Sequence, residues 1–489
     1  MNPQANLPQM AGLHVYPQSV AQMADSIYFL ASMEAGKCLG IIGDTAGFAG
    51  ERAGVDADSP LLCRLTAQNA AALRTRLPWL RPKLLGLQKV AGTGDRLGLA
   101  TPGHIRALRR VGGFAPIWAQ QSMRENARAG RTPQQVLDDA MWGVFQEGWR
   151  EAWGADADHL KTLADVELCV AAGYTFYTVD PGAHVDNEAQ TLPAQDLPGK
   201  LAALPWNELE DSIEEQRRRY LGRNFPLESF DLRLDEVTLA RAAAKYGRAI
   251  AHTKRMYRHL ASLTQHFELE MSVDETDTPT SLEEHFFIAS ELRRLGVRWV
   301  SLAPRYVGRF EKGVDYIGDL QEFEATFSRH AAIARALGPY KLSIHSGSDK
   351  FSVYPIVARH AGDLAHLKTA GTSYLEALRA IAGVDPSLFR EVLIFARQNY
   401  ERDRATYHVS AELARVPVEL TDGQLPGILD SFDARQVLHV TFGSVLDRFG
   451  PRLKEVLTQH EEAHYAALEA HLARHLLAFS LRNQPLLDQ

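Results

Sequence analysis

Short apolar runs alternate with amphipathic stretches over most of the chain. From Lys89 onward, each apolar run is followed by a polar cluster and then by apolar residues at helical spacing. This alternation is typical of parallel strands joined by helical crossovers. The runs that read as strands begin at Lys89, Phe114, Ala157, Tyr174, Phe267, Arg298, Lys341 and Ala365. They predict an α/β fold, a TIM-like (β/α)8 barrel, although fewer strands would suit an open doubly wound sheet.

Several stretches between these strands carry helix start signals. Residues 132–135 (TPQQ) place a threonine N-cap before proline, with glutamine at the third position, which is a capping-box arrangement. Residues 280–284 (TSLEE) precede an apolar stripe at helical spacing. Both predict amphipathic helices that cover a sheet.

The alternation of predicted strands and helices divides the chain into three parts. Residues 1–88 are predicted to form an N-terminal extension packed on the barrel, and residues 89–404 to form the barrel itself. A charged helical insertion at about 186–264 follows the fourth strand and is a candidate lid. Residues 405–489 are predicted to be a helical C-terminal region that packs outside the barrel or in a homo-oligomer contact.

Composition narrows the class of protein. Hydrophobic residues make up 45% and charged residues 23%, which is ordinary for a globular chain and excludes disorder and collagen. The net charge of −7 argues against nucleic acid as a partner. No apolar run reaches the roughly 20 residues that span a bilayer, and no signal peptide is evident, so we expect no membrane association. Cys38, Cys63 and Cys169 are expected to be buried free thiols in the cytoplasm.

The fifth predicted strand alternates polar and apolar residues. Its polar set is Glu268, Glu270, Ser272 and Asp274, which period two places on one face. Inside a barrel this face would line the interior, where carboxylates suit a cation or acid/base chemistry. The alternative is an edge strand with a solvated face.

Other strands also end in polar residues. This is expected in a TIM barrel, because its active site lies at the carboxyl ends of the strands. His345 and Ser346 end the seventh strand, where the histidine is either functional or a satisfied core residue. Asp180 ends the fourth strand and is either a site carboxylate or a turn former.

The tetrapeptide HLKT occurs twice, at 159–162 and at 366–369. We expect both strands to end alike, with Lys161 and Lys368 directed into the mouth and the two histidines on the same faces as the lysines. Such lysines suit an anionic substrate or proton transfer, unless they extend to solvent.

Further polar residues near strand ends could bind substrate hydroxyls or charges: Asp95, Gln120, Gln121, Arg124, Glu125, Arg305 and Lys312. The combination of carboxylates, histidines and lysines, without GxSxG or GxGxxG, fits a metal-assisted reaction on a small polyhydroxylated anion. The mixture of oxygen and imidazole donors suits Mn, Zn, Fe, Co or Ni better than Ca.

Several long runs resemble a known family. HLKT-x2-DVELC-x-AAGYTFYTVDPG-x-HV, FELEMSVDETDTPTS, VSLAPRYVGRFEKGVDYIGDL, KLSIHSGSDKFSVYP and HLKTAGTSYLEALR are similar to the tagaturonate/fructuronate C4-epimerases. The resemblance covers about residues 92–408. It implies a TIM-like barrel, a divalent metal cation, a sugar-acid substrate and an acidic residue at Asp274. Another metal-dependent sugar-acid isomerase or aldolase, or a sugar-acid-binding protein, is the alternative.

The C4 proton of these keto-acids is not adjacent to the C2 ketone, so simple enolisation cannot remove it. Retro-aldol cleavage of C3–C4 or direct proton exchange at C4 would each need a metal and two proton-handling groups. We assign the catalytic roles to Asp274, Glu270 and Lys161, the metal ligands to His345, His366 and Asp180, and substrate binding to Gln121, Arg305, Lys368, Ser346 and Asp95.

Overall fold

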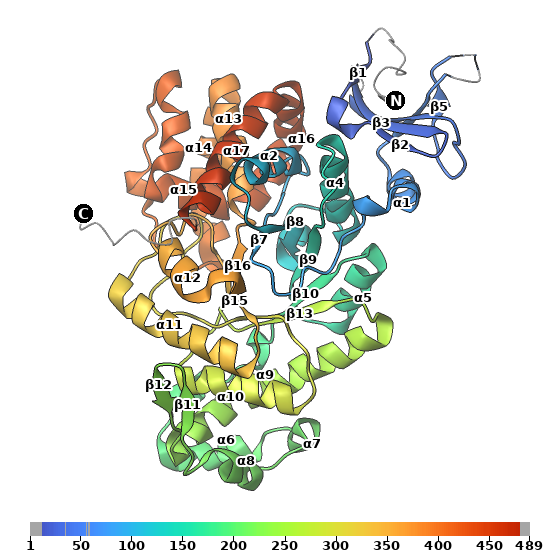
Figure 1. Cartoon of the computed structure of the whole chain (residues 1–489). Helices are drawn as coiled ribbons and strands as arrows, with labels where there is room; N and C mark the ends of the chain where they lie inside the picture. Colours follow the sequence, from blue (N-terminus) through green and yellow to red (C-terminus); the bar gives the residue numbers. More distant parts are fainter. Residues whose placement is uncertain (1–11, 35, 55, 57–58, 480–489) are drawn as a thin grey trace.

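The computed structural model describes residues 12–34, 36–54, 56 and 59–479. Its centre is a closed barrel of eight parallel strands (Figure 1). The strands are β7 (Val90–Gly92), β8 (Ala115–Ser122), β9 (Gly154–Leu160), β10 (Phe176–Val179), β13 (Glu268–Ser272), β14 (Ser301–Ala303), β15 (Lys341–Ile344) and β16 (Ala365–Lys368). Each matches a predicted strand, so the barrel prediction is confirmed.

Strand β13 lies inside the barrel wall. It pairs with β10 on one side and with β14 on the other, so that Glu270 lies opposite both Thr178 and Ser301. Every residue of the strand is buried. The edge-strand alternative is therefore wrong, and Glu270 needs partners because an unpaired buried carboxylate is costly.

Helices surround the barrel. They are α2 (Thr101–Val111), α3 (Met123–Arg128), α4 (Pro133–Gln146), α5 (Leu163–Ala172), α9 (Glu236–Leu263), α10 (Leu282–Arg294), α11 (Leu320–Leu337), α12 (Tyr354–Ala361) and α13 (Thr372–Val384). The predicted starts of α4 and α10 are confirmed, because Thr132 with Gln135 and Ser281 with Glu284 form complete capping boxes. Within the described residues, no helix is both long and apolar enough to cross a membrane.

The N-terminal part is an antiparallel sheet. Its strands are β1 (His14–Val15), β2 (Ala21–Met23), β3 (Ser26–Met33), β4 (Gly36–Ile42), β5 (Glu51–Arg52) and β6 (Leu61–Arg64), and α1 (Ala67–Arg76) follows them. The order is β1-β3-β4-β6-β5, with β2 on β3. Tyr28 and Leu39 of the sheet share one hydrophobic core with Trp142 and Phe145 of α4. The sheet is thus joined to the barrel by buried apolar side chains.

The excursion follows β10, as predicted, and lies beside the outer helices of the barrel. It contains α6 (Leu197–Ala202), α7 (Trp206–Leu209), α8 (Ile213–Tyr220) and the hairpin β11 (Phe225–Leu227) and β12 (Phe230–Leu232), whereas α9 belongs to the barrel. These elements pack on α9, α10 and α11 at the lower end of Figure 1. The Tyr220 hydroxyl donates to Glu291 of α10 at 2.6 Å. This position does not suit a lid over the mouth.

The C-terminal helices form a second hydrophobic core beside the barrel. They are α14 (Pro386–Asp403), α15 (Phe432–Val440), α16 (Phe442–Gln459) and α17 (Glu461–Ala478). Helix α17 runs along α2 and α13 of the barrel. The region thus packs outside the barrel, and it also carries side chains into the mouth.

Candidate functional site

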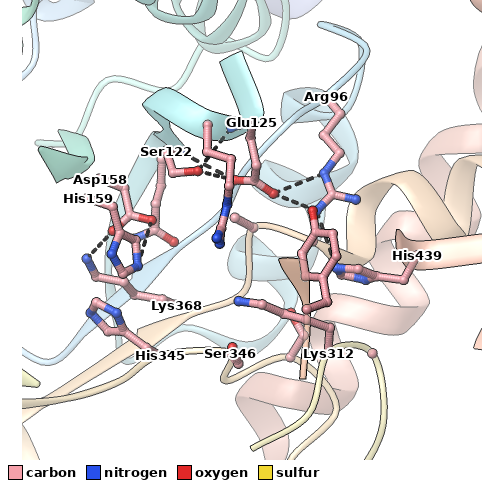
Figure 2. Close-up of a pocket in the computed structure, with 17 residues that line it drawn as sticks. Arg96, Ser122, Glu125, Asp158, His159, Lys312, His345, Ser346, Lys368 and His439 are labelled. Carbon is pink, nitrogen blue, oxygen red and sulfur yellow. Dashed lines mark hydrogen bonds and ion pairs between the residues drawn. The ribbon is translucent and has the colours of Figure 1, made fainter. Parts of the chain in front are cut away.

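Three adjoining cavities open at the carboxyl ends of the barrel strands. The first, drawn in Figure 2, extends from Asp158, His159 and His345 to Arg96 and His439. The second adjoins it at His345 and Lys312, and the third adjoins it at His159. The mouth of the barrel is therefore the candidate site, in keeping with the position of active sites in (β/α)8-barrel enzymes.

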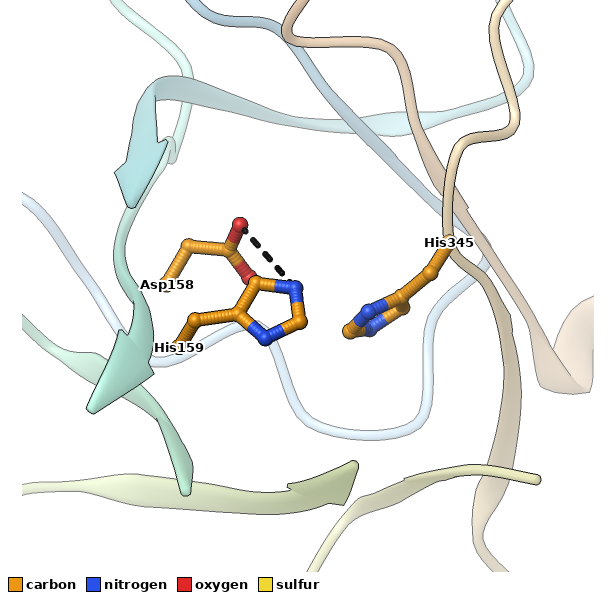
Figure 3. Close-up of side chains that lie close together, drawn as sticks. All are labelled: Asp158, His159 and His345. Carbon is orange, nitrogen blue, oxygen red and sulfur yellow. Dashed lines mark ion pairs between the residues drawn. The ribbon is translucent and has the colours of Figure 1, made fainter. Parts of the chain in front are cut away.

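An irregular backbone at the end of β9 brings two consecutive side chains together. His159 has a positive φ of 53°, and the pairing of β9 with β10 shifts register at this point. Consecutive residues of a regular strand point to opposite faces. Here Asp158 and His159 both lie beside His345, with His159 Nε2 3.8 Å from the Asp158 carboxylate (Figure 3).

His345 faces His159 from the segment that follows β15. The two ring centroids are 5.0 Å apart and the rings are nearly perpendicular. His345 Nε2 lies 2.7 Å from Glu270, and Nδ1 lies 3.1 Å from Asp274. Burial opposes a charged ring, but the attraction of Asp274 and Glu270 raises the pKa of His345. A positive charge is thus stabilised at this position.

Lys368 is a buried link between several carboxylates. Its Nζ lies 2.9 Å from Asp156, 2.7 Å from Asp158 and 2.8 Å from Glu270. These carboxylates raise the pKa of Lys368 despite its burial, so the side chain stays charged. Because its donors are already engaged, Lys368 holds the site together and does not offer a free ammonium to a substrate carboxylate.

His366 lies deeper in the barrel than His345. Its Nδ1 is 3.2 Å from Glu270 and its ring meets Phe176 edge to face. Burial lowers the pKa of His366 to about 4, so the ring is neutral. His366 and His345 both contact Glu270, but His366 is not among the possible metal ligands described below.

Asp180 and Lys161 lie together on the third cavity. Lys161 Nζ is 3.1 Å from the Asp180 carboxylate, and its side chain is 55% exposed. Asp180 is also 3.4 Å from His159 Nδ1 and accepts the Gly182 amide. Although Asp180 is buried, His159 and Lys161 hold its pKa at about 2. Asp180 therefore lines a cavity of the candidate site and also stabilises the turn that follows β10.

The prediction that the two HLKT segments end alike is wrong. Lys368 is buried among carboxylates, whereas Lys161 is half exposed. His366 is deep in the barrel, whereas His159 reaches the mouth. The backbone irregularity at His159 accounts for the difference, because it displaces the residues that follow from the regular strand pattern.

The residues predicted to bind substrate fall into two groups. Ser346 and Arg305 line the cavities. Asp95 instead accepts backbone amides of its own loop, from Gly98 at 2.7 Å and from Leu97 at 3.1 Å, so it shapes the loop. Gln121 is buried outside the lining of the described cavities, and its neighbour Gln120 lines the first cavity and donates to Asp156.

The candidate site also contains residues that received no role from the sequence. They are Asp156, Asp158, Arg96, Ser348, Tyr407, His408 and His439. Asp156 and Asp158 alternate along β9, and this alternation places both side chains on one face of the strand. The sequence could therefore have indicated them. No local pattern marks Tyr407 and His439, because their place depends on how the C-terminal helices pack.

The site fits a divalent cation. Asp158, His159 and His345 each offer a ligand atom, and these atoms lie within 4.8 Å of one another. A second group of His159, Asp180 and Glu275 shares one of these ligands. Although burial opposes it, Asp158 and Asp180 raise the pKa of His159 to about 10, which shows that this position favours positive charge. One carboxylate and two imidazoles suit a transition metal.

The fold and the site together define an enzyme of the (β/α)8-barrel class. Carboxylates, imidazoles and lysines converge at the carboxyl ends of its strands, where such enzymes carry their chemistry.

Comparisons with known proteins specify the class further. A model of the tagaturonate epimerase family matches residues 16–479. The tagaturonate/fructuronate epimerase of Thermotoga maritima is 44% identical over 477 residues, which is 95% of this chain and 96% of that protein. The native crystal structure of the fructuronate-tagaturonate epimerase of Cohnella laeviribosi is 37% identical over 96% of this chain and 97% of its own, with a TM-score of 0.91. A glycerol complex of that protein covers 96% of both chains with a TM-score of 0.90. The chain belongs to the tagaturonate epimerase family and is an isomerase.

Proposed function

We propose that this chain interconverts D-tagaturonate and D-fructuronate by epimerisation at C4, with the help of a divalent metal cation. The observation that carries the proposal is the convergence of Asp158, His159 and His345 in a cavity whose other end is cationic. Membership of the epimerase family supports the choice of substrate. A small hydroxylated anion suits a cavity with a candidate metal site at one end and the basic side chains of Arg96 and Lys312 at the other.

Asp158, His159 and His345 are the residues that would hold the metal. When bound, the ion would stabilise negative charge that develops on a substrate oxygen. Glu270 would orient His345, and Lys368 would orient Asp158. Each of these contacts restrains the side chain of a residue that would bind the metal. Glu270 is thus better suited to positioning than to carrying protons, which replaces the role assigned to it from sequence.

Two groups are placed to handle protons on different sides of the site. Asp274 lines the second cavity beside His345, and Lys161 lines the third cavity beside His159. His345 keeps the pKa of Asp274 well below its usual range in spite of burial, so this carboxylate is ionised. We assign Asp274 and Lys161 as the proton-handling pair, because epimerisation needs a proton donor and acceptor on opposite faces of the carbon, or on opposite ends of a cleaved bond.

We also propose that the enzyme acts in the cytoplasm on a small sugar acid. Cys38, Cys63 and Cys169 are all free and buried, as expected in a reducing compartment. A homo-oligomeric state remains a separate prediction, which light scattering of the purified protein would test.

The proposed reaction is tested by incubating D-fructuronate with the purified protein and following the mixture by proton NMR. We expect tagaturonate to accumulate to an equilibrium that is also reached from tagaturonate. Release of a three-carbon fragment without tagaturonate would favour an aldolase, and formation of an aldose would favour another sugar-acid isomerase. Either outcome would overturn the proposal.

A further inference from the structure

The end of the first cavity farthest from His159 carries a buried guanidinium with an unused donor. The Arg96 side chain is 3% exposed, and its Cζ lies 3.8 Å from the centroid of the Phe442 ring. Its Nε and Nη2 donate to Glu125 at 3.1 and 2.5 Å (Figure 2). Its Nη1 has no hydrogen-bond partner within the described part of the chain. An unsatisfied buried donor that lines a cavity points to an absent acceptor.

His439 supplies a second unused donor at the same end. Burial and the nearby Arg96 hold the pKa of His439 well below its usual value, so the ring is neutral. Arg96 Nη2 lies 3.3 Å from His439 Nε2, which must then accept, and the proton resides on Nδ1. This Nδ1 is buried and has no partner among the described residues.

The amino end of α13 completes this end of the cavity. Ala370 and Gly371 line it, and Gly371 caps the helix without a side-chain acceptor for the first-turn amides. A Cβ on Gly371 would lie 2.2 Å from His439 Cε1, so only glycine lets the ring approach so closely. The amino end of a helix favours anions, and the loops after the last two strands are a frequent anion site in (β/α)8 barrels.

Lys312 adds a positive charge beside these groups. It lines both the first and the second cavity, and in the described residues its ammonium makes no hydrogen bond or ion pair. The carboxylate of Glu125, which lines the same cavity, is bound to Arg96. The same end of the cavity is therefore lined by the ammonium of Lys312, by two hydrogen-bond donors without acceptors among the described residues, and by the amino end of α13.

We propose that Arg96, Lys312, His439 and the amino end of α13 form an oxyanion subsite that binds the carboxylate of the sugar acid. The inference rests on the proposed function for the identity of the substrate, but not for the existence of the subsite. With its carboxylate held here, the substrate chain extends along the cavity toward His159 and His345. The competing anchor is Arg305, which lines the second cavity beside Asp274.

The subsite is tested by calorimetric titration of the full-length protein with D-gluconate and with D-sorbitol. Both have six carbons and lack the ketone, and only gluconate has a carboxylate, so binding is measured without turnover. We expect gluconate to bind at least tenfold more tightly than sorbitol. Lys312→Gln should reduce gluconate affinity about tenfold and leave sorbitol unaffected, whereas Arg305→Gln should leave gluconate affinity near that of the wild type.

Arg96 needs a paired variant, because its removal alone would leave the carboxylate of Glu125 without its ion-pair partner. The double variant Arg96→Gln/Glu125→Gln keeps the local charge balanced and should lose the preference for gluconate. Loss of that preference in Arg305→Gln, with Lys312→Gln unaffected, would overturn the proposal. Inorganic phosphate should compete with gluconate only weakly, and tighter binding of phosphate than of gluconate would overturn the assignment to a carboxylate. Because no turnover is involved, these results are independent of whether C4 epimerisation is detected.

Discussion

His345 and Glu270 are joined across the barrel interior, with Nε2 of the histidine 2.7 Å from Oε1 of the carboxylate. Glu270 is fully buried, and the same oxygen is 2.8 Å from Lys368. One carboxylate thus fixes both a candidate metal ligand and the lysine that holds Asp158. The candidate metal site depends on this contact, because imidazole ligands are oriented by the group that binds their second nitrogen.

Glu270→Gln should weaken the site without changing its shape. The amide keeps the volume of the side chain but loses the charge that orients His345 and balances Lys368. We expect metal affinity or kcat to fall about 10- to 100-fold. Elemental analysis and steady-state kinetics would measure both effects. Glu268→Gln is the matched control, since Glu268 lies on the same face of β13 but contacts Gly86 and should leave kcat near the wild-type value. Equal behaviour of the two variants would contradict the role of Glu270.

Lys368→Met should reduce the free energy of unfolding strongly. The change leaves Asp156, Asp158 and Glu270 buried without their shared cation. Removing one partner of a buried ion pair costs about 3–5 kcal/mol. Urea unfolding would measure the loss. Lys161→Met is the comparison, because that lysine is half exposed and should cost less than about 1 kcal/mol. A small loss for Lys368→Met would show that the carboxylates do not need it.

Asp274→Asn should abolish turnover while the protein keeps its metal. Asp274 contacts His345 Nδ1 at 3.1 Å, but it is outside the Asp158, His159 and His345 group. We expect kcat to fall about 100-fold or more, as for the loss of a general base. The expected metal content equals that of the wild type, whereas His159→Ala should lose metal. Full activity of Asp274→Asn would exclude it as a proton-handling group.

The regular parts of the chain could be predicted from sequence. All eight barrel strands and the capped starts of α4 and α10 follow from periodicity and capping residues. Glu270 and Asp274 could be placed at the site, because alternation along a strand fixes which face a side chain occupies.

The remaining site residues depend on features that periodicity does not encode. The positive φ of His159 breaks the alternation at the end of β9, so the two HLKT segments differ. His439 reaches the mouth only because α15 packs beside the barrel, over a long separation in sequence. Gln120 lines the first cavity and its neighbour Gln121 does not, because a shift of one residue along a strand exchanges the faces.

Lys350 should make the free energy of unfolding depend on pH. Its buried Nζ donates to the carbonyls of Glu311 and Ser348, at 2.7 and 3.0 Å, and so joins two loops of the mouth. Burial lowers the pKa of Lys350 from 10.5 to about 7. Between these values the unfolded chain binds a proton that the folded protein does not, so raising the pH favours folding.

Relative to Lys350→Met, the wild type should therefore gain up to about 1.4 kcal/mol of unfolding free energy per pH unit above pH 7. Urea unfolding of both proteins between pH 7 and 9 would measure the difference. A difference that does not change with pH would show that Lys350 remains charged in the folded protein.

The most direct test of the central claim is the conversion of D-fructuronate by chelator-treated protein in deuterated water, before and after metal is restored. We predict no tagaturonate in the presence of EDTA, and formation of tagaturonate on addition of Mn, Zn, Fe, Co or Ni. Deuterium at C4 would indicate direct proton exchange, and its absence would indicate cleavage and re-formation of the C3–C4 bond. Undiminished conversion by protein shown to be free of metal would contradict the account.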